Sequence, residues 1–147
     1  MKPTVRYTGF LMAAAVLAAA CGGSGSSDTV AAPEATIATP PPTSDITATA
    51  EDFLFTPDAW TAGAGSEVTF QFENQGSVTH TWIILSSPIE SESELSEDLI
   101  VFETSAEAGE AVTITFTAPA AGTYQVVCNV PGHFGLGMEG LLTVTGA

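Results

Sequence analysis

Basic residues are almost absent from this chain of 147 residues. Lys2 and Arg6 are its two Lys or Arg residues, whereas Asp and Glu together number 17, all of them beyond residue 20. The chain beyond residue 20 therefore has no Lys or Arg and 17 carboxylates, a formal charge of −17 with neutral histidines. Such a surface repels the phosphate backbone of DNA and RNA, so a nucleic-acid-binding role is excluded.

Cysteine, histidine and methionine are also scarce. The chain has two Cys, two His and three Met residues. Two cysteines are too few for the disulfide framework of a small secreted domain, although a single Cys21–Cys128 disulfide is compatible with an oxidising compartment. Beyond residue 20 the residues of these three types are Cys21, His80, Cys128, His133 and Met138.

The first 20 residues have the composition of a signal peptide. Lys2 and Arg6 precede an apolar run over Phe10–Ala20, which is shorter than the roughly 20 residues of a membrane-spanning helix. The run ends in Ala18-Ala19-Ala20-Cys21, which resembles a bacterial lipoprotein cleavage site with Cys21 as the lipid-bearing residue; an ordinary secretory signal is the alternative. We expect an extracytoplasmic protein, periplasmic or on the cell surface, that is lipid-anchored to the membrane through Cys21.

Residues 21–44 differ in composition from the rest of the chain. They are rich in Gly, Ser, Ala, Thr and Pro and contain no aromatic residue, so they have little with which to form an apolar core. We predict a lipid-anchored flexible linker over residues 21–44 and one folded domain over residues 45–147.

The domain is predicted to be all-β. Short apolar and β-branched runs are separated by Gly, Pro, Ser and Asn, and several alternate with polar residues, as Val68, Phe70 and Phe72 do. Runs at this spacing are typical of an antiparallel sandwich or barrel, here of about seven to eight strands. A turn of helix fits within Ile89–Leu99. The predicted strands cover residues 46–50, 58–61, 68–72, 80–85, 100–103, 112–116, 123–128 and 142–144.

Four of the scarce residues form one pattern. Four residues separate Cys128 from His133, and four separate His133 from Met138. Strand alternation directs Cys128 toward the core, and it directs His80 to the same face as Trp82. Two imidazoles, a thiolate and a weak thioether are the ligand set of a mononuclear blue-copper site. Zinc binds similar ligands, but structural zinc sites seldom use Met.

The segments around these residues resemble those of the cupredoxins, the small blue copper proteins. The resemblance rests on Gly76–Trp82 and on Cys128–Gly140, and the ligand loop is most similar to that of auracyanins, rusticyanins and sulfocyanins. It implies a Greek-key β-sandwich that carries single electrons. The ligands implied for one type 1 copper ion are His80, Cys128 and His133 in the equatorial positions and Met138 in the axial position.

Two positions depart from the cupredoxin pattern. Members of that family commonly have Asn after the first His and Ser or Thr after the Cys, and these two side chains join the ligand loops by hydrogen bonds. This chain has Thr81 and Asn129, the same pair exchanged, and we predict the same brace because both side chains donate and accept. Val127 stands where plastocyanins have a Tyr that offers a second electron exit, so that route is not expected here.

The predicted function is one-electron transport between membrane-associated redox partners, and not catalysis. With both His used as ligands, none remains for the further metals of a copper enzyme. We expect electrons to enter and leave through the exposed edge of His133, which is ringed by Pro131, Phe134 and Leu136. The acidic cluster within Glu90–Asp98 is expected to steer a transient basic partner such as a cytochrome or an oxidase; solubility is the alternative reason for its charge. We expect a monomer with no small-molecule substrate.

A copper-storage or copper-delivery lipoprotein is the alternative function. Such a protein would favour exposed Met and His clusters for labile exchange, and this chain has none. A stable, reversible one-electron potential distinguishes a carrier from a protein that hands its metal on.

Overall fold

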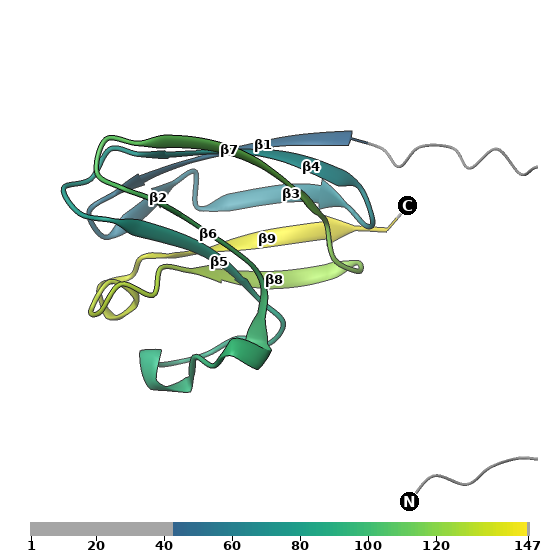
Figure 1. Ribbon diagram of the computed structural model, residues 1–147. Helices are drawn as coiled ribbons and strands as arrows, with labels where there is room; N and C mark the ends of the chain where they lie inside the picture. The colour runs from purple at the N-terminus through teal and green to yellow at the C-terminus, as the bar shows by residue number, and fades with distance from the viewer. Residues whose placement is uncertain (1–42, 147) are drawn as a thin grey trace, which may run out of the picture. The chain divides into compact units, whose positions relative to one another are not determined.

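The computed structural model describes residues 43–146 and shows nine β-strands in two sheets (Figure 1). The predicted all-β sandwich is confirmed. The predicted signal peptide and most of the predicted linker lie outside the described residues, and residues 43 and 44 already belong to the first strand. Within residues 43–146 no helix is long and apolar enough to cross a membrane. The strands are β1 (Thr43–Glu51), β2 (Leu54–Thr56), β3 (Ala59–Gly63), β4 (Glu67–Asn74), β5 (His80–Leu85), β6 (Ile100–Ala106), β7 (Ala111–Thr117), β8 (Gly122–Val127) and β9 (Glu139–Thr145).

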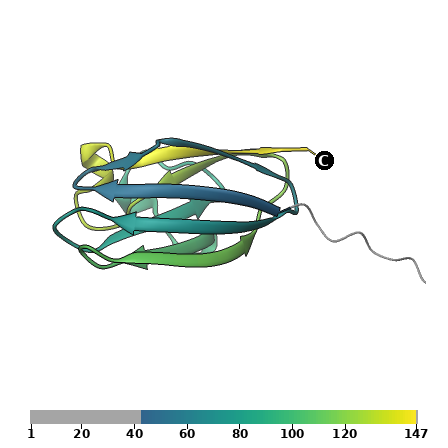
Figure 2. The same ribbon diagram turned by 90° about the horizontal axis from the view of Figure 1, so that it is seen from above.

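The strands are divided between a four-stranded and a five-stranded sheet. The first has the order β2-β1-β4-β7 and the second the order β3-β9-β8-β5-β6; Figure 2 shows β1, β4 and β7 side by side in the first sheet. Two pairings, β1 with β4 and β3 with β9, are parallel, which differs from the antiparallel sandwich predicted. Parallel neighbours need a crossover connection. The chain between β1 and β4 makes this crossover, because β3, which follows β2 and precedes β4 in the sequence, belongs to the second sheet.

The main core lies between the two sheets. The alternation predicted for 68–72 is confirmed, since Val68, Phe70 and Phe72 are fully buried while neighbouring side chains face outward. The indole of Trp82 lies at the centre of an aromatic cluster, with its ring centroid 4.3 Å from that of Phe70 and 5.3 Å from that of Trp60. Aromatic packing of this kind makes the core rigid, and it forms beside the end of β5 that carries His80.

A smaller apolar cluster lies on the outer face of the second sheet. All six residues of β5 are buried, because the connection from β5 to β6 folds back over the outward-facing side chains. The helical turn predicted within this connection is present as two short 3-10 helices, Glu92–Glu94 and Glu97–Leu99. The buried members of the cluster are Ile83, Leu85, Ile89 and Val127, and its partly buried members are Leu95, Leu99, Ile100 and Phe134.

The turn between β1 and β2 has an unusual backbone. Phe53 has φ of 73°, and it is the one non-glycine residue in the described range with positive φ. For a bulky residue this conformation is a genuine outlier that costs free energy and persists where the surroundings fix it. The turn leads into β2, a three-residue strand that the sequence pattern did not indicate.

Candidate metal centre

Three donor side chains converge at one end of the sandwich. His80 is the first residue of β5, Cys128 follows the last residue of β8, and His133 lies in the loop that joins β8 to β9. The Cys128 Sγ atom lies 3.9 Å from Nδ1 of His80 and 3.7 Å from Nδ1 of His133, and the three donor atoms all lie within 4.8 Å of one another. His80 and Cys128 are fully buried and His133 is 7% exposed. Cys128 packs in the main core with Val126, whereas Val127 belongs to the outer cluster, which confirms the predicted strand parity of Cys128.

The spacing of these atoms fits a single metal ion. Bonds of about 2.3 Å to sulfur and about 2.0 Å to nitrogen, the lengths that zinc takes, would let one ion reach both atoms of each sulfur–nitrogen pair. The two pairs are 3.9 Å and 3.7 Å apart. Both imidazoles turn the same nitrogen, Nδ1, toward the sulfur. A soft thiolate with two imidazoles in this arrangement suits copper.

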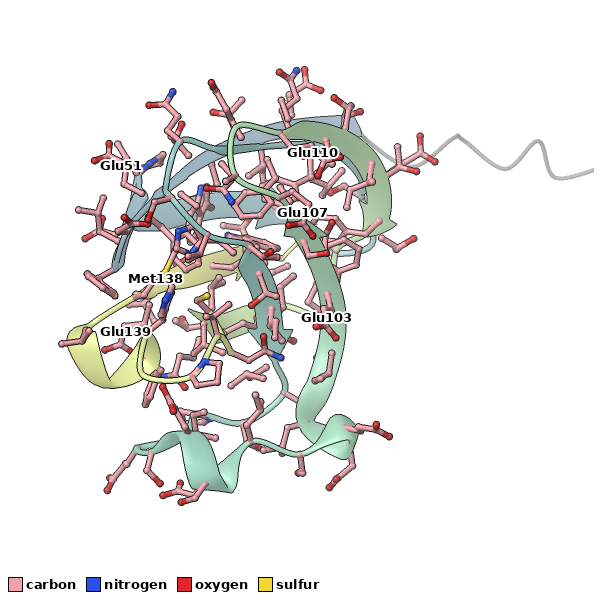
Figure 3. All side chains as sticks on the ribbon, turned by 60° about the vertical axis from the view of Figure 1, so that its left-hand side comes forward. Glu51, Glu103, Glu107, Glu110, Met138 and Glu139 are labelled. Atoms are coloured by element: carbon pink, nitrogen blue, oxygen red, sulfur yellow. The ribbon has the colours of Figure 1, made fainter. Side chains whose placement is uncertain are left out.

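Met138 closes the loop that contains Cys128 and His133. It is fully buried and immediately precedes β9, and Figure 3 shows it at the loop end of the sandwich. Its backbone N–H donates to the carbonyl of His133 at 3.0 Å, and its carbonyl accepts from the N–H of Cys128 at 3.2 Å. These two hydrogen bonds hold the Met138 backbone next to Cys128 and His133. His80, Cys128, His133 and Met138 thus form the arrangement of a type 1 copper site.

Two glycines allow the loop its tight course. Gly132 and Gly137 have φ of 86° and 94°, which other residues rarely adopt. Between them lies a short 3-10 helix, Phe134–Leu136. Backbone bonds inside the loop, such as that from the N–H of Gly137 to the carbonyl of Phe134 at 2.9 Å, contribute to its shape.

The predicted brace between Thr81 and Asn129 is present. The Thr81 hydroxyl donates to Oδ1 of Asn129 at 2.9 Å and accepts from the backbone N–H of Asn129 at 2.9 Å. The same hydroxyl lies 3.6 Å from Sγ of Cys128. The exchange of the two residue types therefore keeps a direct link between the start of β5 and the residue after Cys128.

Asp52, which sequence reasoning did not single out, lies behind His80. Its Oδ1 atom is 3.4 Å from Nε2 of His80, and its carboxylate accepts from the N–H of Ser77 at 2.9 Å and from the Ser77 hydroxyl at 2.7 Å. When a His binds a metal through Nδ1, its Nε2–H group is free to donate to a carboxylate such as this one. No local pattern identifies Asp52, because it is 28 positions from His80.

Burial and hydrogen bonding set the protonation of this pair. Burial lowers the pKa of the His80 imidazole, although Asp52 opposes that shift. The hydrogen bonds from Ser77 lower the pKa of the Asp52 carboxyl, with a smaller contribution from His80. At neutral pH the pair is therefore a neutral imidazole facing a carboxylate, which leaves the Nδ1 lone pair of His80 available to a metal.

The surroundings of His133 differ from those expected. The Phe53 ring stands edge-on to the His133 ring, with centroids 5.1 Å apart, and Phe53 is 44% exposed. Phe134 instead packs in the outer apolar cluster. Pro131 and Leu136 are exposed on the loop, the latter at 64%. The apolar cover of the His133 ring thus includes a residue from the β1–β2 turn.

Comparisons with known proteins agree with this geometry. Residues 42–145 match the family described as copper binding proteins of the plastocyanin/azurin family. The chain is 35% identical to auracyanin-A of Chloroflexus aurantiacus, over 98% of this chain and 99% of that protein.

Solved structures of blue copper proteins share the fold. The structure of auracyanin A, a blue copper protein from Chloroflexus aurantiacus, matches with a TM-score of 0.62 and 33% identity, over 71% of this chain and 100% of the other. Rusticyanin from Thiobacillus ferrooxidans matches with a TM-score of 0.60 and 26% identity, over 70% of this chain and 77% of the other. With the matching sequence family and the convergent donor set, these findings show that the chain belongs to the plastocyanin/azurin family of copper-binding proteins.

Proposed function

We propose that His80, Cys128, His133 and Met138 hold one type 1 copper ion, and that the protein carries single electrons between membrane-associated partners outside the cytoplasm. The matching family is described as copper binding proteins, and the resemblance to the cupredoxins implies transport of single electrons. Copper bound by this donor set supplies a one-electron couple. The observation that carries the proposal is the burial of His80, Cys128 and His133 with their donor atoms within 4.8 Å.

The protein itself keeps these donors in place. Cys128 and His133 are tied through the backbone bonds of Met138, and Thr81 joins Asn129 to β5. Side chains already held near one metal geometry move little when the charge of the metal changes, which favours fast electron exchange. Burial of the thiolate also excludes water from it.

The structure of residues 43–146 does not favour the alternative of copper storage or delivery. A delivery protein exchanges metal through accessible ligands, whereas His80, Cys128 and Met138 are fully buried. Within residues 43–146 these three and His133 are all of the His, Cys and Met residues, so no second set remains to receive a metal.

Reconstitution with copper tests the proposal. We expect the oxidised protein to show an intense thiolate-to-copper charge-transfer band and a reversible one-electron wave in voltammetry. Protein loaded with zinc is the control and should show neither, because zinc has no redox chemistry. A colourless copper complex, or one that releases its metal on reduction, would contradict the carrier function.

The proposed location and partner rest on charge and on the N-terminal sequence. The leader over residues 1–20, followed by Cys21, supports secretion and lipid anchoring, and the Gly, Ser and Pro content of residues 22–42 supports a tether. The domain carries no Lys or Arg beyond the leader, so its attractive partner is a basic redox protein. Glu90 and Glu92 line a shallow groove beside the ligand loop, together with Phe134.

Neutralising two carboxylates of the β5–β6 connection should slow electron transfer with a basic cytochrome. We expect the double substitution Glu90→Gln with Glu97→Gln to reduce the association rate several-fold at low ionic strength and to flatten its salt dependence. Asp45→Asn with Glu67→Gln removes the same charge near the starts of β1 and β4 and is the matched control. Stopped-flow kinetics over a range of ionic strengths measures both. Equal effects of the two pairs would show that net charge acts without a local steering site.

A further inference from the structure

The loop that carries Cys128, His133 and Met138 is held from outside by a carboxylate. Several of its backbone N–H groups bond within the loop, as that of His133 does to the carbonyl of Val130 at 3.0 Å. The N–H of Gly132, by contrast, donates to Oε1 of Glu92 at 2.8 Å. Glu92 is 40 positions away in the chain and belongs to the connection between β5 and β6.

The segment around Glu92 is itself fixed. Ile89 is buried and Leu95 is partly buried in the outer apolar cluster, on either side of Glu92. Between them the Ser91 hydroxyl donates to Oε1 of Glu94 at 2.9 Å, and the N–H of Glu90 donates to Oε2 of Glu94 at 3.2 Å. The Glu92 backbone is therefore positioned by packing and by a local hydrogen-bonded turn.

The same cluster also receives Phe134, the residue after His133. Gly132 and Phe134, which flank His133 in sequence, are thus both attached to the β5–β6 connection, one by a hydrogen bond and the other by apolar packing. Hydrogen bonds that end on a charged group are about twice as strong as neutral ones. Gly132 also has the left-handed φ of 86° that turns the chain toward His133.

We propose that Glu92 is a positioning residue of the metal centre. Its carboxylate holds Gly132 and thereby the approach of His133 to Cys128, and its negative charge lies beside the loop that carries three of the four ligands. The acidic connection is in this way part of the scaffold of the site as well as part of the molecular surface. The consequence for a bound metal rests on the copper function proposed above, whereas the hold on Gly132 does not.

The hold on Gly132 is tested in metal-free protein. Hydrogen exchange of the Gly132 amide, followed by NMR, should be about tenfold faster in Glu92→Ala than in the parent. Glu92→Gln keeps an oxygen acceptor at the same place and should restore most of the protection. Glu97→Gln removes a charge from the same connection without touching the loop and should leave the Gly132 exchange rate unchanged. An unchanged rate in Glu92→Ala would overturn the proposal.

The effect on the site is tested by voltammetry of the copper-loaded variants. Both Glu92→Ala and Glu92→Gln should raise the reduction potential, because a nearby negative charge stabilises the oxidised centre. Glu92→Ala alone should also slow electron self-exchange several-fold, since His133 is then less firmly held. If the two Glu92 variants had the same reduction potential as Glu97→Gln, the proposed effect of the Glu92 charge on the metal centre would be refuted. Failure of every protein, including the parent, to form a coloured copper complex would instead refute the proposed function and leave the Gly132 result standing.

Discussion

Serine in place of Cys128 is expected to abolish the charge-transfer colour of the copper-loaded protein. The thiolate is the only soft anionic donor near the two imidazoles in the described residues, with Sγ 3.7 Å and 3.9 Å from their Nδ1 atoms. A serine hydroxyl is nearly the same size, but it is a hard donor that stays protonated at neutral pH and gives no sulfur-to-copper transition. Visible absorption and EPR spectra of Cys128→Ser report the change directly.

The chain offers its own control for this experiment. Cys21 is the other cysteine, and Cys21→Ser should leave the spectrum unchanged while removing the residue proposed to carry lipid. Far-UV circular dichroism of Cys128→Ser should match the parent, because the substitution is small and the site lies at one end of the sandwich. An absorption band that survives in Cys128→Ser would show that the colour comes from another donor.

A methyl group at Gly76 should disrupt the metal centre as strongly, although Gly76 is not a ligand. An added Cβ would overlap Nε2 of His80 and lie 2.6 Å from Oδ1 of Asp52. His80 is fully buried, so its ring has little room to move aside. We expect Gly76→Ala to weaken copper binding by at least tenfold and to destabilise the metal-free domain by about 1–3 kcal/mol, as overpacking does.

Copper titration and thermal unfolding of Gly76→Ala measure these two effects. Gly63→Ala is the matched control, because its added Cβ would make only ordinary contact, 3.9 Å from Cβ of Ser66. That variant should bind copper like the parent and unfold at nearly the same temperature. If Gly76→Ala bound copper as tightly as the parent, His80 would tolerate displacement, and the packing of Gly76 against His80 would not determine copper affinity.

The ligands were predictable because the chain has so few residues that bind soft metals. Once the leader is removed, His80, Cys128, His133 and Met138 are nearly all that remain, and strand alternation orients two of them. The structure brings His80, Cys128 and His133 together and buries Met138 beside them in the same loop. The Thr81–Asn129 brace was predictable for a similar reason, since each is adjacent to a ligand.

The residues that support the ligands were not predictable, because their contacts are distant in sequence. Asp52 reaches His80 across 28 positions and Glu92 reaches Gly132 across 40, and acidic residues are common throughout this chain. Phe53 covers His133 from a turn whose positive φ has no signal in its residue type. Local patterns report which side of a strand is buried, whereas tertiary contacts decide which exposed loops meet.

The fold shows the same division. Alternation identified the interior face of β4, but β5 is apolar on both faces, and only the structure shows that the β5–β6 connection covers the second one. The parallel pairing of β1 with β4 was also missed. Periodicity within a strand contains no information about the direction of its neighbour, which depends on how the chain crosses between sheets.

The course of β1 decides how the domain can be attached to a surface. This strand begins at Thr43, ends at Glu51 and is followed directly by Asp52 beside His80, so it spans the length of the sandwich, about 30 Å at the usual rise per residue. In Figure 1 the start of β1 and the loop between β8 and β9 lie at opposite ends of the sandwich. An electrode or bead coupled directly at the start of β1 would therefore hold the domain with its metal centre facing the solution. Adsorption through Leu136 and Phe53 would place the same centre against the electrode, where tunnelling is fastest.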